Sequence, residues 1–86
     1  MEKFNLFQAK NDAESYVHNI YNGTSTVSAV LHVAVDSSYR CLSVPELGDE
    51  RKLVEQQCAC IFTVRYNMDT AYVSATEYIN KEFVGE

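Results

Sequence analysis

Three cysteines and two histidines are the residues of this chain whose side chains could do chemistry. Cys58 and Cys60 are two positions apart, so on a β-strand both thiols would point to one face, about 7 Å apart. With Cys41 and His32 they would supply four zinc ligands. Zinc sites usually contain pairs such as C-x2-C, and here only one close pair exists. We therefore interpret the thiols as core residues, with metal binding and redox or nucleophilic chemistry as alternatives.

The histidines give no clear indication of catalysis. His32 lies in the most apolar segment, and we expect it at the edge of the core with a hydrogen bond to the backbone. A cysteine or serine nucleophile needs a base within reach and a group that orients the base, and the linear spacing indicates neither. The three glycines lie far apart, so no phosphate-binding loop is present. The sequence thus predicts no catalytic, cofactor-binding or metal-binding residues.

One helix is predicted over about residues 12–22. Asn11 would cap it, with Glu14 at the spacing of a capping box. Apolar residues then recur on one helical face, at Ala13, Tyr16, Val17, Ile20 and Tyr21. Gly23 stands where a left-handed residue ends many helices. Before this helix, the alternation in residues 4–7 predicts a short strand.

The rest of the chain is rich in β-forming residues. Strands are predicted over 24–35 and 39–44, with a turn at Asp36-Ser37-Ser38. The continuous apolar end of the first strand indicates burial on both faces. Residues 58–78 predict a hairpin with its turn at Asn67-Met68-Asp69.

Two further helices are expected, over about 49–57 and 75–84, the second because Ser74 and Glu77 repeat the capping-box spacing. A strand is the alternative for 49–57, because Val54 and Gln56 continue the period of two seen from Cys58 onward. The four phenylalanines are expected in the core: Phe4, Phe7, Phe62 and Phe83. Together these elements predict a single α+β domain over 1–86. It would have four or five mostly antiparallel strands and two or three helices on one face.

Composition narrows the function classes. The chain has 12 acidic and 7 basic residues, for a formal net charge of −5. Nucleic-acid affinity comes largely from lysine and arginine, so nucleic-acid binding is not expected, whereas a partner protein with a basic surface is favoured. The odd number of cysteines and the lack of an apolar leader or of a membrane-length apolar run predict a reducing compartment, the cytoplasm, and no membrane association.

Candidate contact residues are of two kinds. Tyr39 and Arg40 lie at a predicted hairpin turn and are of the types enriched at binding hot spots, although Tyr39 could equally cover the sheet edge. The acidic candidates form two groups, Glu46, Asp49, Glu50 and Glu55, then Asp69, Glu77 and Glu82. A solvated surface is the ordinary explanation for such groups, and a negative patch that docks on a basic partner is the sharper one.

The leading hypothesis is a non-enzymatic protein–protein interaction module. In size, acidity and lack of catalytic motifs the chain resembles the small accessory proteins of phages and mobile elements. That resemblance implies an inhibitor that occludes a host enzyme or defence complex, and it transfers no residues. The first alternative is a homo-oligomer, such as a homodimer, that sequesters a small ligand such as a nucleotide between subunits. The second is a small enzyme.

Overall fold

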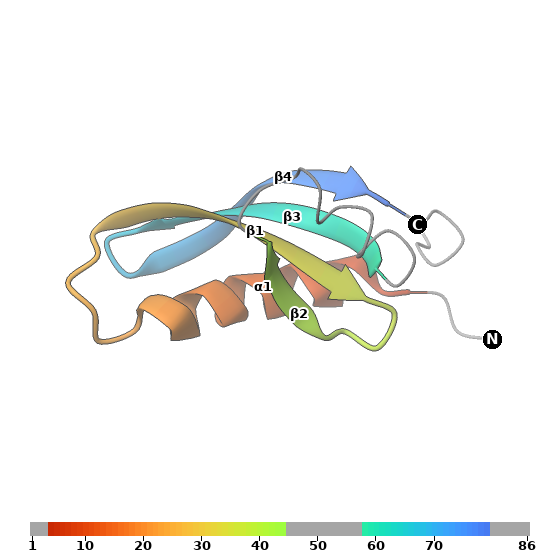
Figure 1. The fold of residues 1–86 in the computed structure, drawn as a ribbon, viewed down its shortest axis with the longest axis horizontal. Coiled ribbons are helices and arrows are strands. Elements are labelled where there is room, and N and C mark those ends of the chain that lie inside the picture. The colour runs from red at the N-terminus through yellow and green to blue at the C-terminus, as the bar shows by residue number, and fades with distance from the viewer. Residues whose placement is uncertain (1–3, 45–57, 80–86) are drawn as a thin grey trace.

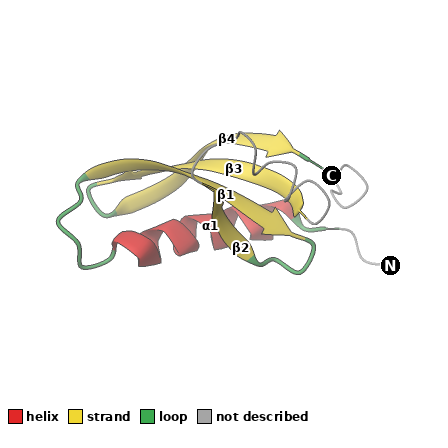
Figure 2. Ribbon diagram, in the orientation of Figure 1, coloured by secondary structure: helices red, strands yellow, loops and turns green. Residues whose placement is uncertain are grey.

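The computed structural model describes residues 4–44 and 58–79, which form one helix and four strands (Figure 1). In chain order these are α1 (Leu6–Tyr21), β1 (Ser28–Asp36), β2 (Cys41–Val44), β3 (Cys58–Asn67) and β4 (Thr70–Tyr78). The strands form one sheet in the order β2-β1-β3-β4, and every neighbouring pair is antiparallel. Helix α1 lies along one face of this sheet (Figure 2). The predicted α+β class and antiparallel sheet are confirmed, with one helix in the described residues rather than two or three.

Helix α1 begins earlier than the sequence predicted. Asn5, not Asn11, is the N-cap, and its Oδ1 accepts a hydrogen bond from the Gln8 backbone N–H at 3.0 Å. The predicted strand over 4–7 is therefore wrong. Small residues explain the difference, because Ala9 and Ala13 extend the buried stripe by a turn toward the N-terminus.

The two ends of α1 test two other expectations. After the helix, Gly23 has a φ of +81°, the left-handed backbone expected at that position. Phe7 lies on the outer side of the helix and is exposed, so its predicted place in the core is wrong. Phe4 and Phe62 are buried as predicted, and Phe83 lies outside the described residues.

Strands β1 and β2 form the first hairpin. Val33, Ala34 and Val35 are all buried, which confirms the predicted burial of β1 on both faces. The predicted turn chemistry is present, because the Asp36 Oδ1 accepts from the backbone N–H groups of Ser38 and Arg40 at 2.8 and 2.9 Å.

Strands β3 and β4 form the second hairpin, with the predicted turn at Met68 and Asp69. Strand β4 continues to Tyr78, so the helix predicted to start at Ser74 is wrong. The Ser74 hydroxyl does not cap a helix but donates to the Thr63 carbonyl on β3 at 3.2 Å. The helix predicted over 49–57, and the part of the last helix beyond 79, lie outside the described residues.

The main core lies between α1 and the sheet. Its buried members are Phe4, Ala9, Ala13, Val17, Val33, Val35, Ala59, Cys60, Phe62, Val64 and Tyr66. A second cluster, Ala34, Val44, Cys58 and Ile61, contains the alternate residues and so lies on the opposite face. Burial of apolar area in these clusters is the main stabilising term of the fold.

A β-bulge separates two of the cysteines. The β1–β3 register shifts so that Val35 pairs with Cys60 while Asp36 pairs with Cys58, which leaves Ala59 as the extra residue. As a result Cys60 packs under α1 and Cys58 in the cluster on the other face. The prediction that both thiols share one face is wrong, because it assumed unbroken alternation.

Both edge strands are hydrogen-bonded to the helix. The Glu14 Oε2 accepts from the Val73 backbone N–H on β4 at 2.9 Å. The Tyr16 hydroxyl accepts from the Ser43 backbone N–H on β2 at 3.2 Å. Unpaired edge N–H groups are templates for strand addition by another chain, and α1 occupies one such group on each edge.

Candidate functional site

The thiols are placed for packing rather than for reaction. Burial raises the pKa of Cys60 to about 12, and the neighbouring Cys58 and Cys41 thiols add to the shift. Burial, with Asp12 and Asp36 nearby, raises the pKa of Cys41 to about 11. Thiolate is the nucleophile and the metal ligand, so both groups are held in the unreactive form at neutral pH. No group of three or more metal-ligating side chains occurs in residues 4–44 and 58–79.

His32 lies away from these two thiols. It pairs with Val44 and Thr63 on its neighbouring strands, in the row that faces away from α1. Its Nδ1 lies 3.2 Å from the Thr63 Oγ1. The hydrogen bond is therefore to a side chain rather than to the backbone as expected. The sheet separates His32 from Cys41 and Cys60, so neither pair forms the nucleophile and base of a catalytic site.

Tyr39 has a structural task at the β1–β2 turn. Its ring stacks on Phe4 with centroids 5.0 Å apart, and its hydroxyl accepts from the Asn5 backbone N–H at 2.8 Å. It thereby joins the turn to the start of α1, although its φ of +63° is unfavourable for a non-glycine residue. Arg40 beside it is exposed.

The structure does not bring the described acidic candidates together. Asp69 lies in the β3–β4 turn at one end of the sheet, and Glu77 lies near the far end of β4, opposite Ile61. Tyr39 and Arg40 lie in the β1–β2 turn, which adjoins the edge strand on the other side of the sheet. The remaining candidates, Glu46, Asp49, Glu50, Glu55 and Glu82, lie outside the described residues.

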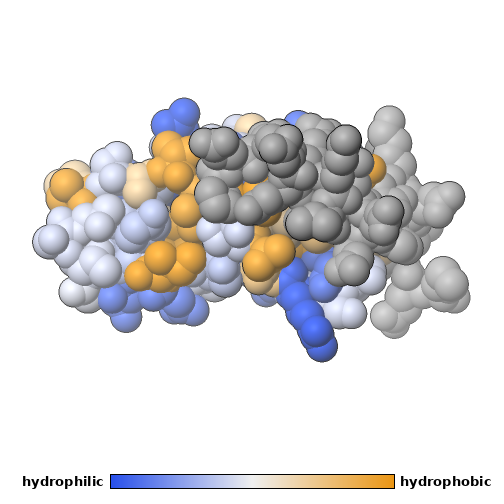
Figure 3. Space-filling model, viewed as in Figure 1, coloured by the Kyte–Doolittle hydropathy of each residue, from blue (hydrophilic) through white to orange (hydrophobic). Residues whose placement is uncertain are grey.

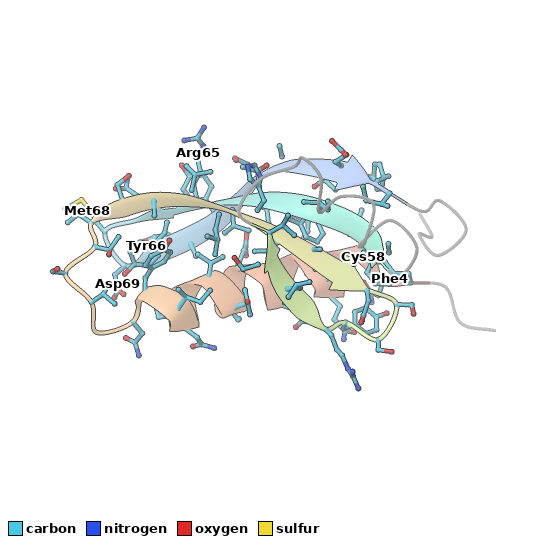
Figure 4. The ribbon with its side chains drawn as sticks, viewed as in Figure 1. Phe4, Cys58, Arg65, Tyr66, Met68 and Asp69 are labelled. Atoms are coloured by element: carbon cyan, nitrogen blue, oxygen red, sulfur yellow. The ribbon has the colours of Figure 1, made fainter. Side chains whose placement is uncertain are left out.

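Four of the eight large hydrophobic side chains exposed in the described residues lie toward the end of the molecule that carries the β3–β4 turn. Val27 is 65% exposed, Val30 48%, Met68 74% and Tyr72 45%. Arg65, also exposed, lies between Val30 and Tyr72 in register across the three strands β1, β3 and β4. We call these five residues the hairpin-end patch. Figure 3 shows some hydrophobic surface at this left-hand end, where Figure 4 places Met68, with Arg65 farther along the top of the view.

Two side chains hold this end of the molecule in place. The Asp69 carboxylate lies 3.3 Å from the His18 Nε2 at the end of α1, and it accepts from the Tyr66 hydroxyl at 3.4 Å. Tyr66 in turn packs against the Tyr21 ring, with centroids 4.8 Å apart. Burial, together with the nearby Asp69, raises the pKa of Tyr66. The turn is thus fastened to the helix, and the patch beside it is presented on a fixed frame.

The turn itself uses unusual residues. Met68 and Asp69 have φ values of +50° and +75°, as in the two-residue turns that favour Asn-Gly or Asp-Gly. Left-handed backbone costs a residue without local compensation about 1–2 kcal/mol. The Met68 backbone N–H donates to the Val27 carbonyl at 2.7 Å, which joins the tip to the segment before β1.

Sequence reasoning missed most of the hairpin-end patch. It placed contacts at the turns and recognised the turn at Met68, but it treated the apolar end of β1 as buried and named neither Val30 nor Tyr72 as a contact residue. The register places Tyr72 against Arg65. The available signal was the turn, because a methionine where Asn or Gly is favoured departs from the usual chemistry.

Comparison with known proteins gives no relative from which to transfer residues. No protein-family model, no curated protein and no solved structure matches this chain.

Proposed function

We propose that this chain is a non-enzymatic protein-binding module that contacts its partner through the hairpin-end patch. The observation that carries the proposal is the row Val30, Arg65 and Tyr72, which the sheet holds side by side on the face away from α1. Tyrosine and arginine dominate binding hot spots, and exposed aliphatic neighbours exclude water around them. Between this row and Met68 the same face carries the exposed polar residues Ser28, Asn67 and Thr70.

The chemistry of the described residues supports binding over catalysis. Catalysis by a cysteine requires a thiolate and a base within reach. Here the pKa values of all three thiols are raised. His32 lies across the sheet from Cys41 and Cys60, and Cys58, which shares its face, is five residues along β3 from Thr63, the residue paired with His32. The α1 hydrogen bonds to both edge strands also favour contact through side chains of the face away from α1 over addition of a strand.

Affinity capture tests the proposal. The full chain, tagged at one terminus, is used as bait in a lysate of its native host, next to an Arg65→Ala/Tyr72→Ala double variant. Leu42→Ala is the matched control, because Leu42 is a similarly exposed strand residue of the same face, about 13 Å farther along the sheet. We expect one protein that the wild type and the control retain and the double variant loses.

Two results would contradict the proposal. One is that the wild-type bait retains no protein above the level of an empty resin. The other is that the double variant, shown by circular dichroism to be folded, retains the same protein equally well. The narrower form of the proposal, an inhibitor that occludes a host enzyme, requires in addition that the captured partner lose activity when it is bound.

A further inference from the structure

No contact described within the chain explains why position 68 is a methionine. Met68 is the first residue of the two-residue turn, its φ is +50°, and its side chain is 74% exposed. Asparagine and glycine adopt this backbone more readily. The bond from its N–H to the Val27 carbonyl uses only the backbone, so any residue except proline could make it.

The other turn residue shows the contrast. Asp69 also has a positive φ, but its carboxylate contacts His18 and Tyr66 and so joins the turn to α1 and β3. These side-chain contacts therefore compensate the unfavourable positive φ of Asp69. The described hydrogen bond of Met68 is made by its backbone, so its side chain gives no comparable compensation for its positive φ. Strained residues that persist without internal compensation are typical of sites selected for function.

We infer that Met68 is the anchor of the hairpin-end patch, and that its side chain enters an apolar pocket on the partner protein. The inference rests on the proposed function. Met68 lies at the left-hand end of the molecule, close to the segment that joins α1 to β1 (Figure 4), and a flexible thioether there can adapt to an irregular pocket. Asp69 beside it is 76% exposed and faces basic groups at the rim of that pocket.

Charge favours a protein over the other large partners. The chain carries a formal charge of −5, which is repelled by anionic bilayers and by phosphate backbones. Asp69 adds a negative charge next to the anchor itself. An apolar pocket with a lysine or arginine at its rim matches both features of the tip.

Photo-crosslinking tests which surface receives Met68. The chain has two methionines, Met1 and Met68, so labelling with the diazirine analogue photo-methionine places a crosslinker at the tip. A Met68→Leu variant is the matched control, because it keeps an apolar tip and carries the label only at Met1. In host lysate we expect a crosslink from position 68 to apolar residues of one partner protein near a lysine or arginine, absent from the control.

A second variant, Met68→Asn, tests whether the left-handed backbone at position 68 lowers stability. Met68→Asn should shift the urea midpoint of unfolding upward and weaken binding of the captured partner at least tenfold. Leu42→Asn should leave that binding within twofold. An unchanged or lower urea midpoint, unchanged affinity, or crosslinks to lipid, to nucleic acid or to a second copy of the chain would overturn the inference.

The two proposals fail differently. If the wild type captures no protein, the proposed function fails and the anchor fails with it. If the wild type captures a partner that Met68→Asn binds equally well, only the anchor is wrong.

Discussion

At the scale of single residues, burial decides what the cysteines can do. Cys60 is fully buried between α1 and the sheet, and Cys41 is half-buried beside Asp12 and Asp36. Both surroundings disfavour the thiolate. A pattern that could be a metal or redox site is thereby turned into part of the core, and this consequence can be tested by titration.

We expect the stability of the protein to fall steeply in alkali. The pKa values of Cys41 and Cys60 are about 11 and about 12 in the fold, against 9.0 as the ordinary value. The folded state therefore holds these protons more tightly, so its advantage is complete below pH 9 and is lost as pH rises through those values. Each thiol contributes a slope of up to about 1.4 kcal/mol per pH unit in that window.

Urea unfolding under reducing conditions from pH 8 to pH 11 measures this slope. A Cys60→Ala variant is the comparison, because it removes one of the two thiols while the rest of the chain is unchanged. We expect the variant to be less stable at pH 8 and to lose stability more slowly above pH 9. Parallel pH profiles for the two proteins would show that the fold does not raise the pKa of the Cys60 thiol.

At the scale of elements, the start of α1 offers a direct comparison of two asparagines. Asn5 caps the helix, and Asn11 lies exposed within it. We expect Asn5→Ala to lower the free energy of unfolding by about 1 kcal/mol, since it removes the acceptor for the Gln8 N–H. Asn11→Ala should be neutral or slightly stabilising because alanine favours helix. Chemical denaturation of both variants measures the two changes in unfolding free energy. A larger loss for Asn11→Ala than for Asn5→Ala would place the helix start at Asn11.

The helix side chains that reach the sheet edges lead to another prediction. Glu14→Ala leaves the Val73 N–H without its described acceptor, and we expect a loss of about 1–2 kcal/mol in unfolding free energy. Tyr16→Phe removes only the hydroxyl that bonds Ser43 and should cost about 1 kcal/mol. Light scattering on the Glu14→Ala/Tyr16→Phe double variant should show association of the chains through the exposed strand edges. A monodisperse double variant of unchanged stability would show that these bonds do not protect the edges.

Local patterns predicted some elements well and others poorly. The β-branched runs of β1 and β3 and the Asp36 turn could be recognised because each signal is contained in a few neighbouring residues. Residues 4–7 could not, because their alternation competed with an N-cap at Asn5 and with a stripe of small alanines. Ser74 and Glu77 have the spacing of a capping box, but pairing with β3 overrides that local preference.

The candidate site was harder to predict for a related reason. Val30, Arg65 and Tyr72 are distant in sequence, and only the register of three strands aligns them. That register includes two irregularities, near Asp36 and near Val64, and each bulge changes which side chains share a face. Periodicity alone does not place such shifts.

At the scale of the whole molecule, the two ends of the sheet carry different features. The β1–β2 turn is tied by Tyr39 to the start of α1. The opposite end carries the hairpin-end patch, with α1 fastened to it through His18 and Asp69. Among the described residues, no helix has the length and apolar character needed to cross a bilayer. The exposed hydrophobic side chains of the patch form the surface through which we propose contact with another protein.

The most direct test of this account is the affinity of the purified partner for the patch, measured by titration calorimetry. Relative to wild type, Arg65→Ala/Tyr72→Ala should bind about 30-fold more weakly or worse, the loss expected of hot-spot residues. Leu42→Ala, on the same face but away from the patch, should bind as wild type does. Equal affinity of the double variant and wild type, or a large loss confined to Leu42→Ala, would place the binding surface elsewhere and contradict the account.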